Sequence, residues 1–304
     1  MFNQLQRNLS GITFSFGLLA AAAGCSGSDT DTATSSGAGG VANPGCVPLP
    51  VDPANPEFGY DPKDTMDGPA AWGTIPNASD MAAYPECGDA KVQQAPIALP
   101  SVQMPGTLGG LTLDAMTLSW TKASVTHLEN KGYTWQGTVA GTPANTIQYK
   151  DEAYTLAQFH FHTPSEHTLG GKSFPMEGHF VHVGGKGLVG VAIGILFEES
   201  PTDNPELAKI WDQFNVCPEP KAVALATPAS LELSGLFPTD ASHFEYDGGL
   251  TAPPCTQTVH FVIMSQPMKA SAAQMKAFSD SLGPTNRPTQ PVLAETVLTF
   301  KSEK

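Results

Sequence analysis

Residues 158–182 constrain the fold and chemistry of this chain more than any other stretch, because they place three histidines in two strand-like patterns. The stretch reads QFHFHTPSEHTLGGKSFPMEGHFVH, so His160 and His162 lie near its start and His179 lies near its end. In a β-strand, residues two apart point to the same face. If residues 165–174 connect two neighbouring strands, the three imidazoles meet on one face of a sheet.

Three histidines on like-facing positions predict a metal site. A single strand histidine is usually a core or surface residue, but each buried polar group without a partner costs roughly 2–7 kcal/mol. One metal ion satisfies all three rings, and three imidazoles with one position left open are typical of catalytic zinc. We therefore predict a Zn²⁺ site formed by His160, His162 and His179. Another divalent metal stays possible, although imidazole ligands suit zinc.

The composition favours a loop-rich, mainly β protein. Hydrophobic residues make up 40% of the 304-residue chain and charged residues only 14%, with 30 Gly and 27 Pro. These numbers allow one sizeable domain plus extra segments. The net charge of -14 disfavours nucleic acid and anionic membrane surfaces as partners.

The N-terminal part predicts export. Residues 1–24 combine Arg7 with a short apolar run and small residues before Cys25, as in a lipoprotein signal peptide in which that Cys becomes lipidated. An ordinary secretory signal is the alternative. Residues 25–52, rich in Ser, Gly, Thr and Pro, predict a flexible tether before a domain over residues 53–304. We expect a periplasmic or cell-envelope protein whose only contact with a membrane is an N-terminal lipid.

Three further segments have clear local signals. Residues 187–197, GLVGVAIGILF, form an apolar run that predicts a strand buried on both faces. Asn204-Pro205 predicts the start of a helix through Phe214, with Asn as the cap and Pro in the first turn. Residues 271–282 predict a second helix, because Ser271 and Gln274 have the spacing of a capping box and Gly-Pro follows.

Several motifs together resemble the α-class carbonic anhydrases of the bacterial type. The motifs are QFHFH, SEHT, GKxFPxExHxVH and LTAPPC, and the resemblance runs from residue 58 to the C terminus. It implies a mainly β (α+β) single domain with a large, mostly antiparallel, twisted central sheet and short peripheral helices. The implied reaction is the reversible hydration of CO₂ to bicarbonate and a proton, with a zinc-held hydroxide as the nucleophile. CO₂ and bicarbonate are then the small-molecule partners of a monomer or homodimer.

The resemblance also implies roles for individual residues. Gln158 and Glu177 would hold the outer nitrogens of His160 and His179, and His162 would donate to a backbone carbonyl near Thr285. Thr251 would orient the nucleophile, with the Glu166 carboxylate behind it. The implied apolar substrate pocket consists of Val181, Ala192, Leu250, Val259 and Phe261.

One departure from the family pattern affects proton transfer. The family places a histidine that relays protons at the position of Tyr133. Histidine changes its charge near neutral pH, whereas tyrosine has a pKa of about 10. We expect turnover to be limited by proton transfer more than is usual in the family. His127 and His260 are other candidates for a relay, and the sequence does not place either on the cavity wall.

The five cysteines suit an exported protein. The resemblance implies a disulfide between Cys87 and Cys255. If Cys25 carries a lipid, parity leaves Cys46 to pair with Cys217.

Two other functions compete with CO₂ hydration. A catalytically silent binding module could keep the same fold, but such relatives typically lose a zinc ligand, and none is lost here. A zinc esterase could use the same centre, but no acyl pocket is evident in the sequence.

Overall fold

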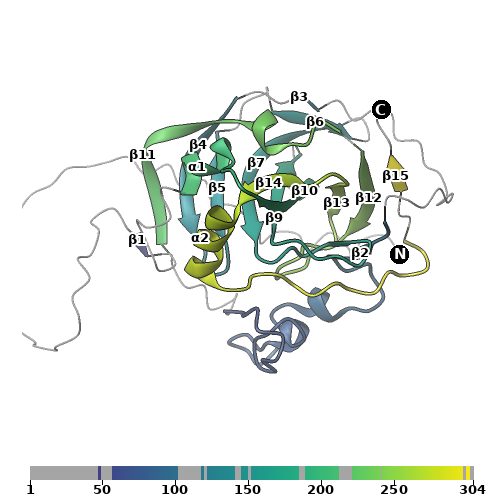
Figure 1. Ribbon diagram of the computed structural model, residues 1–304. Helices are drawn as coiled ribbons and strands as arrows, with labels where there is room; N and C mark the ends of the chain where they lie inside the picture. The colour runs from purple at the N-terminus through teal and green to yellow at the C-terminus, as the bar shows by residue number, and fades with distance from the viewer. Residues whose placement is uncertain are drawn as a thin grey trace, which may run out of the picture. The chain divides into compact units, whose positions relative to one another are not determined.

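Two antiparallel strands, β7 (Glu152–His162) and β9 (Met176–Val183), lie side by side in the computed structural model of the chain (Figure 1). His160 lies opposite His179 in their register, so the predicted pairing of the histidine strands is confirmed. The structure describes residues 47–48, 57–101, 118–119, 122–140, 145–149, 152–184, 189–211, 221–240, 242–296 and 299–301.

These two strands belong to one large, mostly antiparallel sheet, as the sequence predicts. The sheet has 13 strands, and its main order is β1-β11-β4-β5-β7-β9-β10-β13-β12-β15. Strand β10 is the exception, since it pairs in parallel with β13 and β14. The other strands of this sheet are β1 (Val47–Pro48), β3 (Leu118–Ser119), β4 (Lys122–Asn130), β5 (Trp135–Val139), β6 (Thr146–Tyr149), β10 (Val189–Ser200), β11 (Lys221–Glu232), β12 (His243–Gly248), β13 (Val259–Met264), β14 (Met268–Ser271) and β15 (Thr299–Lys301). Strands β2 (Ala98–Leu99) and β8 (Thr168–Leu169) pair in parallel as a separate two-stranded sheet.

The two faces of the central strands differ in chemistry because their residues alternate. Phe159 and Phe161 point away from the histidines into the main apolar core. The ring of Phe161 packs edge-on against Trp211, at 5.0 Å between ring centroids, and against Phe278, at 6.1 Å. Trp211 and Phe278 belong to the two α-helices of the described residues, α1 (Pro205–Trp211) and α2 (Ala272–Leu282). The helices therefore cover the face of the sheet opposite the histidine cluster.

Both helices begin where the sequence predicts. The Asn204 side chain accepts hydrogen bonds from the backbone N–H groups of Glu206 and Leu207, at 3.0 and 3.2 Å. Ser271 and Gln274 form the predicted capping box at the start of α2. The described part of α1 ends at Trp211, and the rest of its predicted length lies outside the described residues.

The predicted buried strand is also present, as part of β10, in which Val191, Ile193, Ile195 and Phe197 have no exposed surface. Val47 and Pro48, which fall inside the segment predicted as tether, pair with β11 as β1. The predicted signal peptide, Cys25 and the Cys46–Cys217 pair lie outside the described residues.

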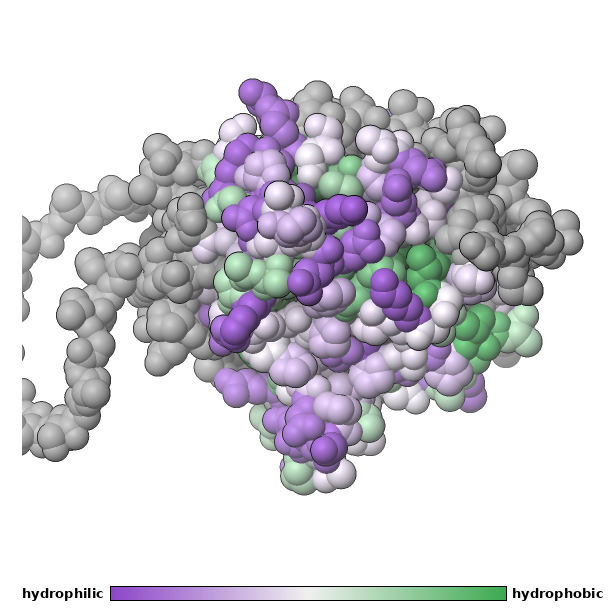
Figure 2. All heavy atoms as spheres, viewed as in Figure 1, coloured by the Kyte–Doolittle hydropathy of each residue, from purple (hydrophilic) through white to green (hydrophobic). Residues whose placement is uncertain are grey.

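The surface is largely hydrophilic on the side seen in Figure 2, where apolar residues form only small areas. The exposed large hydrophobic residues of the described chain are Met66, Met81 and Val292. Within the described residues, no helix is both long and apolar enough to cross a membrane.

The cap of α2 gives a testable prediction for stability. Ser271→Ala removes the hydroxyl that accepts a hydrogen bond from the Gln274 backbone, at 3.1 Å. We expect the free energy of unfolding to fall by about 1 kcal/mol, measured by urea denaturation. Ser279→Ala, at a half-buried position of the same helix whose hydroxyl makes only an exposed hydrogen bond to the Lys276 carbonyl, is the control and should change stability by less than about 0.5 kcal/mol. Equal effects of the two substitutions would contradict the capping role.

Candidate metal centre

His160, His162 and His179 converge on one point above the sheet. One ring nitrogen from each lies within 4.8 Å of the corresponding nitrogens of the other two. The ring centroids are 5.1 Å apart for His160 and His162, 5.2 Å for His160 and His179, and 4.9 Å for His162 and His179. Alternation along β7 and the register with β9 produce this convergence, as the sequence analysis expects.

Each ring has its outer nitrogen held by a different partner. Nδ1 of His160 lies 2.8 Å from Gln158 Oε1. Nδ1 of His162 donates to the Thr285 carbonyl at 2.6 Å, and Nε2 of His179 lies 2.8 Å from Glu177 Oε1. A fixed outer nitrogen sets the tautomer and leaves the inner nitrogen with a free lone pair. These are the three contacts that the resemblance implied.

The residues present fit a zinc ion. Nε2 of His162 is buried and has no hydrogen-bond partner among the described residues, which is costly unless a ligand meets it. Burial lowers the pKa of His162 to about 4, and burial together with the neighbouring rings lowers the pKa of His160 well below its usual range. Both rings are therefore neutral at physiological pH, as metal ligands must be.

Glu177 organises the surroundings of the cluster. Besides His179, its carboxylate accepts hydrogen bonds from the backbone N–H groups of Glu166 and His167, at 2.9 and 2.8 Å, and from the His167 ring, at 2.7 Å. Burial alone would raise its pKa. The adjacent His167 ring and the hydrogen bonds from His167 and His179 outweigh burial and hold the pKa of Glu177 well below its usual range.

Glu166 is the second buried carboxyl group beside the cluster. Burial raises the pKa of Glu166 to about 7, although His179, the Arg287 backbone and the Thr251 hydroxyl each lower it. Its Oε1 accepts a hydrogen bond from the Arg287 backbone at 2.9 Å. Its Oε2 lies 3.5 Å from Nε2 of His162 and has no hydrogen-bond partner of good geometry among the described residues. Thr251 and Glu166, which the resemblance pairs, thus lie beside each other at the cluster.

Apolar residues on β9, β10 and β13 line the sheet face that has the three histidines. Val181, Ala192 and Phe261 lie opposite one another on β9, β10 and β13, in the row next to the one that contains His179. Val259 and Leu250 pack into the same cluster as Ala192 and Phe261. The structure thus brings together all five residues of the implied substrate pocket.

Comparison with known proteins identifies the family that has this arrangement. The sequence model of the eukaryotic-type carbonic anhydrases matches residues 67–298. The chain belongs to this family.

Relatives of known name agree. A carbonic anhydrase from Pectobacterium carotovorum is 38% identical over 54% of this chain, and the match spans 64% of that protein, slightly less than two thirds. A carbonic anhydrase from Neisseria gonorrhoeae is 33% identical over 76% of this chain and 84% of its own length. The solved α-carbonic anhydrase from Photobacterium profundum has 30% identity and a TM-score of 0.66, covering 80% of this chain and 99% of that chain.

Tyr133, at the position where the resemblance implies a proton-relaying histidine, belongs to an aromatic cluster. Its ring packs against Phe58, at 4.8 Å between centroids, and lies 6.2 Å from Tyr60. Burial and the nearby charge of Glu129 raise the pKa of Tyr133 above its usual value. A hydroxyl with a pKa above its usual value does not change its charge near neutral pH.

His260 points to the face of the sheet opposite the three histidines, so it cannot relay protons from the metal centre. It pairs with Asp247 across β12 and β13, where alternation points it away from Phe261 and the substrate side. Its Nδ1 is 2.7 Å from Asp247 Oδ1 and 3.0 Å from the Tyr149 hydroxyl.

Several supporting residues carry no simple sequence signal. His167 links Glu177 to the Tyr246 hydroxyl, 2.6 Å from its Nε2. Gly194 faces the metal site so closely that a Cβ there would lie 3.1 Å from Glu177 Oε1. His167 lies in the segment between β7 and β8, and Gly194 lies opposite His179 on β10, so neither residue type alone reveals these contacts.

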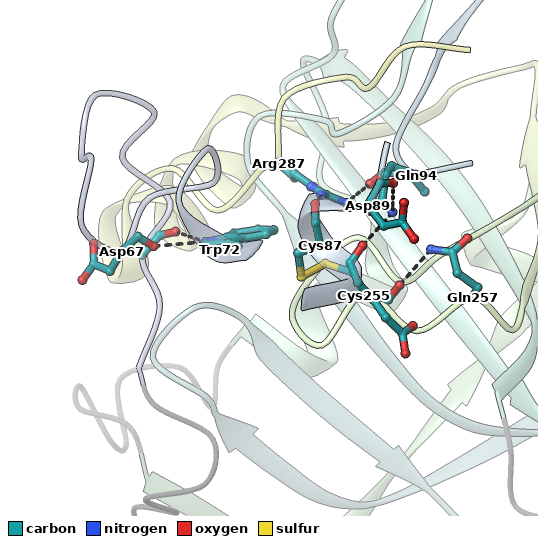
Figure 3. Close-up of a disulfide and its surroundings, with 11 residues drawn as sticks. Asp67, Trp72, Cys87, Asp89, Gln94, Cys255, Gln257 and Arg287 are labelled. Atoms are coloured by element: carbon teal, nitrogen blue, oxygen red, sulfur yellow. Dashed lines mark hydrogen bonds between the residues drawn. A yellow bond between two sulfur atoms is a disulfide. The ribbon is translucent and has the colours of Figure 1, made fainter. Parts of the chain in front are cut away.

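The Cys87–Cys255 disulfide that the resemblance implied is present (Figure 3). Its surroundings reach the centre through Arg287, whose guanidinium donates to the carbonyls of Cys87 and Ala95, at 2.9 and 2.7 Å. The backbone N–H of the same arginine donates to Glu166. The disulfide and the carboxyl group beside the histidines are therefore connected through one residue.

Removing this disulfide should destabilise the protein. The bridge joins residues 168 positions apart, and closing so long a loop typically contributes about 2–5 kcal/mol. We expect Cys87→Ser/Cys255→Ser to lower the free energy of unfolding by that amount, measured by guanidinium denaturation of the oxidised proteins. The prediction is wrong if the double variant unfolds at the wild-type denaturant concentration.

Proposed function

We propose that this chain is a zinc carbonic anhydrase that catalyses the reversible hydration of CO₂ to bicarbonate and a proton. The observation that carries the proposal is the convergence of His160, His162 and His179, each with one nitrogen held and one directed to a common point. Membership of the carbonic anhydrase family supports the choice of reaction.

The three histidines would hold Zn²⁺ as neutral ligands. When bound in such a site, zinc acidifies a water molecule to a pKa of about 7, a value established on carbonic anhydrases themselves. Gln158 and the Thr285 carbonyl fix the rings of His160 and His162, and Glu177 fixes that of His179. These contacts keep each lone pair directed inward.

Thr251 and Glu166 would orient the attacking group. An ionised Glu166 can only accept a hydrogen bond, so the Thr251 hydroxyl must donate to it. The Thr251 oxygen is then left as an acceptor toward the centre. Burial raises the pKa of Glu166 and so favours its protonated form, whereas a divalent cation held by the histidines would favour the ionised carboxylate.

The apolar row would receive CO₂. Val181, Ala192 and Phe261 are 5% exposed or less and offer no hydrogen bond. A linear molecule with little capacity for hydrogen bonding can therefore displace water from this side of the centre.

A stopped-flow CO₂ hydration assay with metal analysis tests the proposal. We expect wild type to bind about one zinc per chain and to be active, because three neutral imidazoles suit zinc. His162→Ala should lose most of the zinc and the activity. His260→Ala, which removes an imidazole from the opposite face of the sheet, is the matched control and should keep its zinc. Full activity in His162→Ala would falsify the assignment.

Tyr133→His should raise the maximal turnover in weak buffer. The substitution replaces a hydroxyl of raised pKa with a ring that exchanges protons near neutral pH. We expect turnover to increase severalfold, which is less than the rate gain typical of one acid–base group. The value of kcat/KM should change little. Added imidazole buffer should raise the wild-type rate for the same reason. If neither treatment changes turnover, proton transfer does not limit this enzyme.

A further inference from the structure

One histidine of this chain is exposed on the face of the sheet that carries the metal ligands. The sequence has eight histidines, all within the described residues. His127 is exposed and His160 is half-buried, whereas the remaining six are buried. Of the histidines that do not form the cluster, His127 alone is therefore open to solvent.

Strand register places His127 on the ligand face. It lies opposite Thr138 on β5, and Thr138 lies opposite Gln158 on β7. Residues directly opposite in an antiparallel pair point to the same face. His127 therefore shares the face of Gln158 and of His160, which is two residues further along β7.

The separation suits transfer through water. Two strand spacings of about 4.8 Å and one two-residue step of about 7 Å put the Cα atoms of His127 and His160 roughly 12 Å apart. Both side chains project from the same face, so the rings are too far apart for a direct hydrogen bond and close enough for a few waters to bridge them. The residues between them, Thr138, Gln136 and Gln158, are polar and half-buried. This side of the centre is thus hydrophilic, in contrast to the apolar row of Val181 and Ala192.

We propose that His127 relays protons between the metal centre and solvent, in place of the histidine that Tyr133 replaces. The inference rests on the proposed function. Each CO₂ hydrated releases one proton, which passes along hydrogen-bonded waters to a ring nitrogen of neutral His127. The imidazolium then gives the proton to a buffer base in solvent and becomes neutral again. In the dehydration direction, the same steps run in reverse.

The charges around His127 leave its ring available. Its Nδ1 lies 3.1 Å from the Thr126 hydroxyl, which leaves Nε2 for exchange with water. On its own strand the nearest carboxylate on this face is Glu129, which forms an ion pair with Lys131. The residues opposite His127 on β5 and β11 are Thr138 and Ala224, and neither is titratable.

Heavy-oxygen exchange between CO₂ and water at equilibrium tests the relay, because it yields two separate rates. One is the interconversion of CO₂ and bicarbonate, and the other is the release of labelled water, which needs a proton delivered to the centre. His127→Gln should slow release by about tenfold or more, and interconversion by less than about twofold. An unchanged release rate, or an equal loss of both rates, would overturn the proposal.

Two further variants decide between His127 and its neighbours. Glu129→Gln is the matched control on the same strand, and its release rate should stay within about twofold of wild type. A loss in Glu129→Gln as large as that in His127→Gln would assign the relay to the carboxylate and overturn the proposal. Tyr133→His, added to His127→Gln, should restore release, as should imidazole buffer. Failure of both to restore release would contradict a proton-transfer defect.

The ring itself provides a readout that does not depend on activity. Because the His127 ring is exposed, diethyl pyrocarbonate should modify it in the metal-free protein, as peptide mass spectrometry would show, and this modified peptide should be absent in His127→Gln. A His127 ring that does not react would overturn the relay, because it would not meet solvent. Wild type that fails to interconvert CO₂ would instead disprove the proposed function, so the two failures are distinguishable.

Discussion

The register between β7 and β9 is the constraint on which the rest of the site depends. His160 and His179 meet only because they are directly opposite in this antiparallel pair. A shift of one residue would turn the whole ligand set of one strand toward the apolar core. The Phe159 and Phe161 side chains, packed on the other face, make such a shift costly. Packing under the helices thus fixes the geometry of the metal centre on the opposite side.

This geometry buries the negative charge of the Glu177 carboxylate, which must therefore have hydrogen-bond donors around it. A fully buried carboxylate is unfavourable without partners, and Glu177 is 0% exposed. Two backbone N–H groups and two imidazoles surround it, which is close to the full capacity of a carboxylate. The neighbouring Glu166 has fewer donors, and its pKa moves in the opposite direction. The different numbers of hydrogen-bond donors thus give Glu177 a lowered pKa and Glu166 a raised one, although the two carboxyl groups are close together.

Much of this arrangement could be predicted from the sequence, because alternation is a local property. The spacing of His160 and His162, the cap at Asn204 and the capping box at Ser271 depend on residues close in the chain. The position of His127 could not be predicted in this way. Strand β4 has an irregularity between Val125 and His127, and one extra residue in a strand reverses the faces that follow it. The raised pKa of Glu166 likewise depends on burial by distant segments.

The hydrogen bond from His162 to the Thr285 carbonyl joins residues 123 positions apart. A metal ligand in the middle of the chain is therefore oriented by a segment near its end. Contacts this distant in sequence are costly to form, so the His162 ring would stay free to turn until the segment with Thr285 docks. Tight capture of the cation would then require the whole domain to fold, because the β7–β9 pair alone orients only two of the three rings.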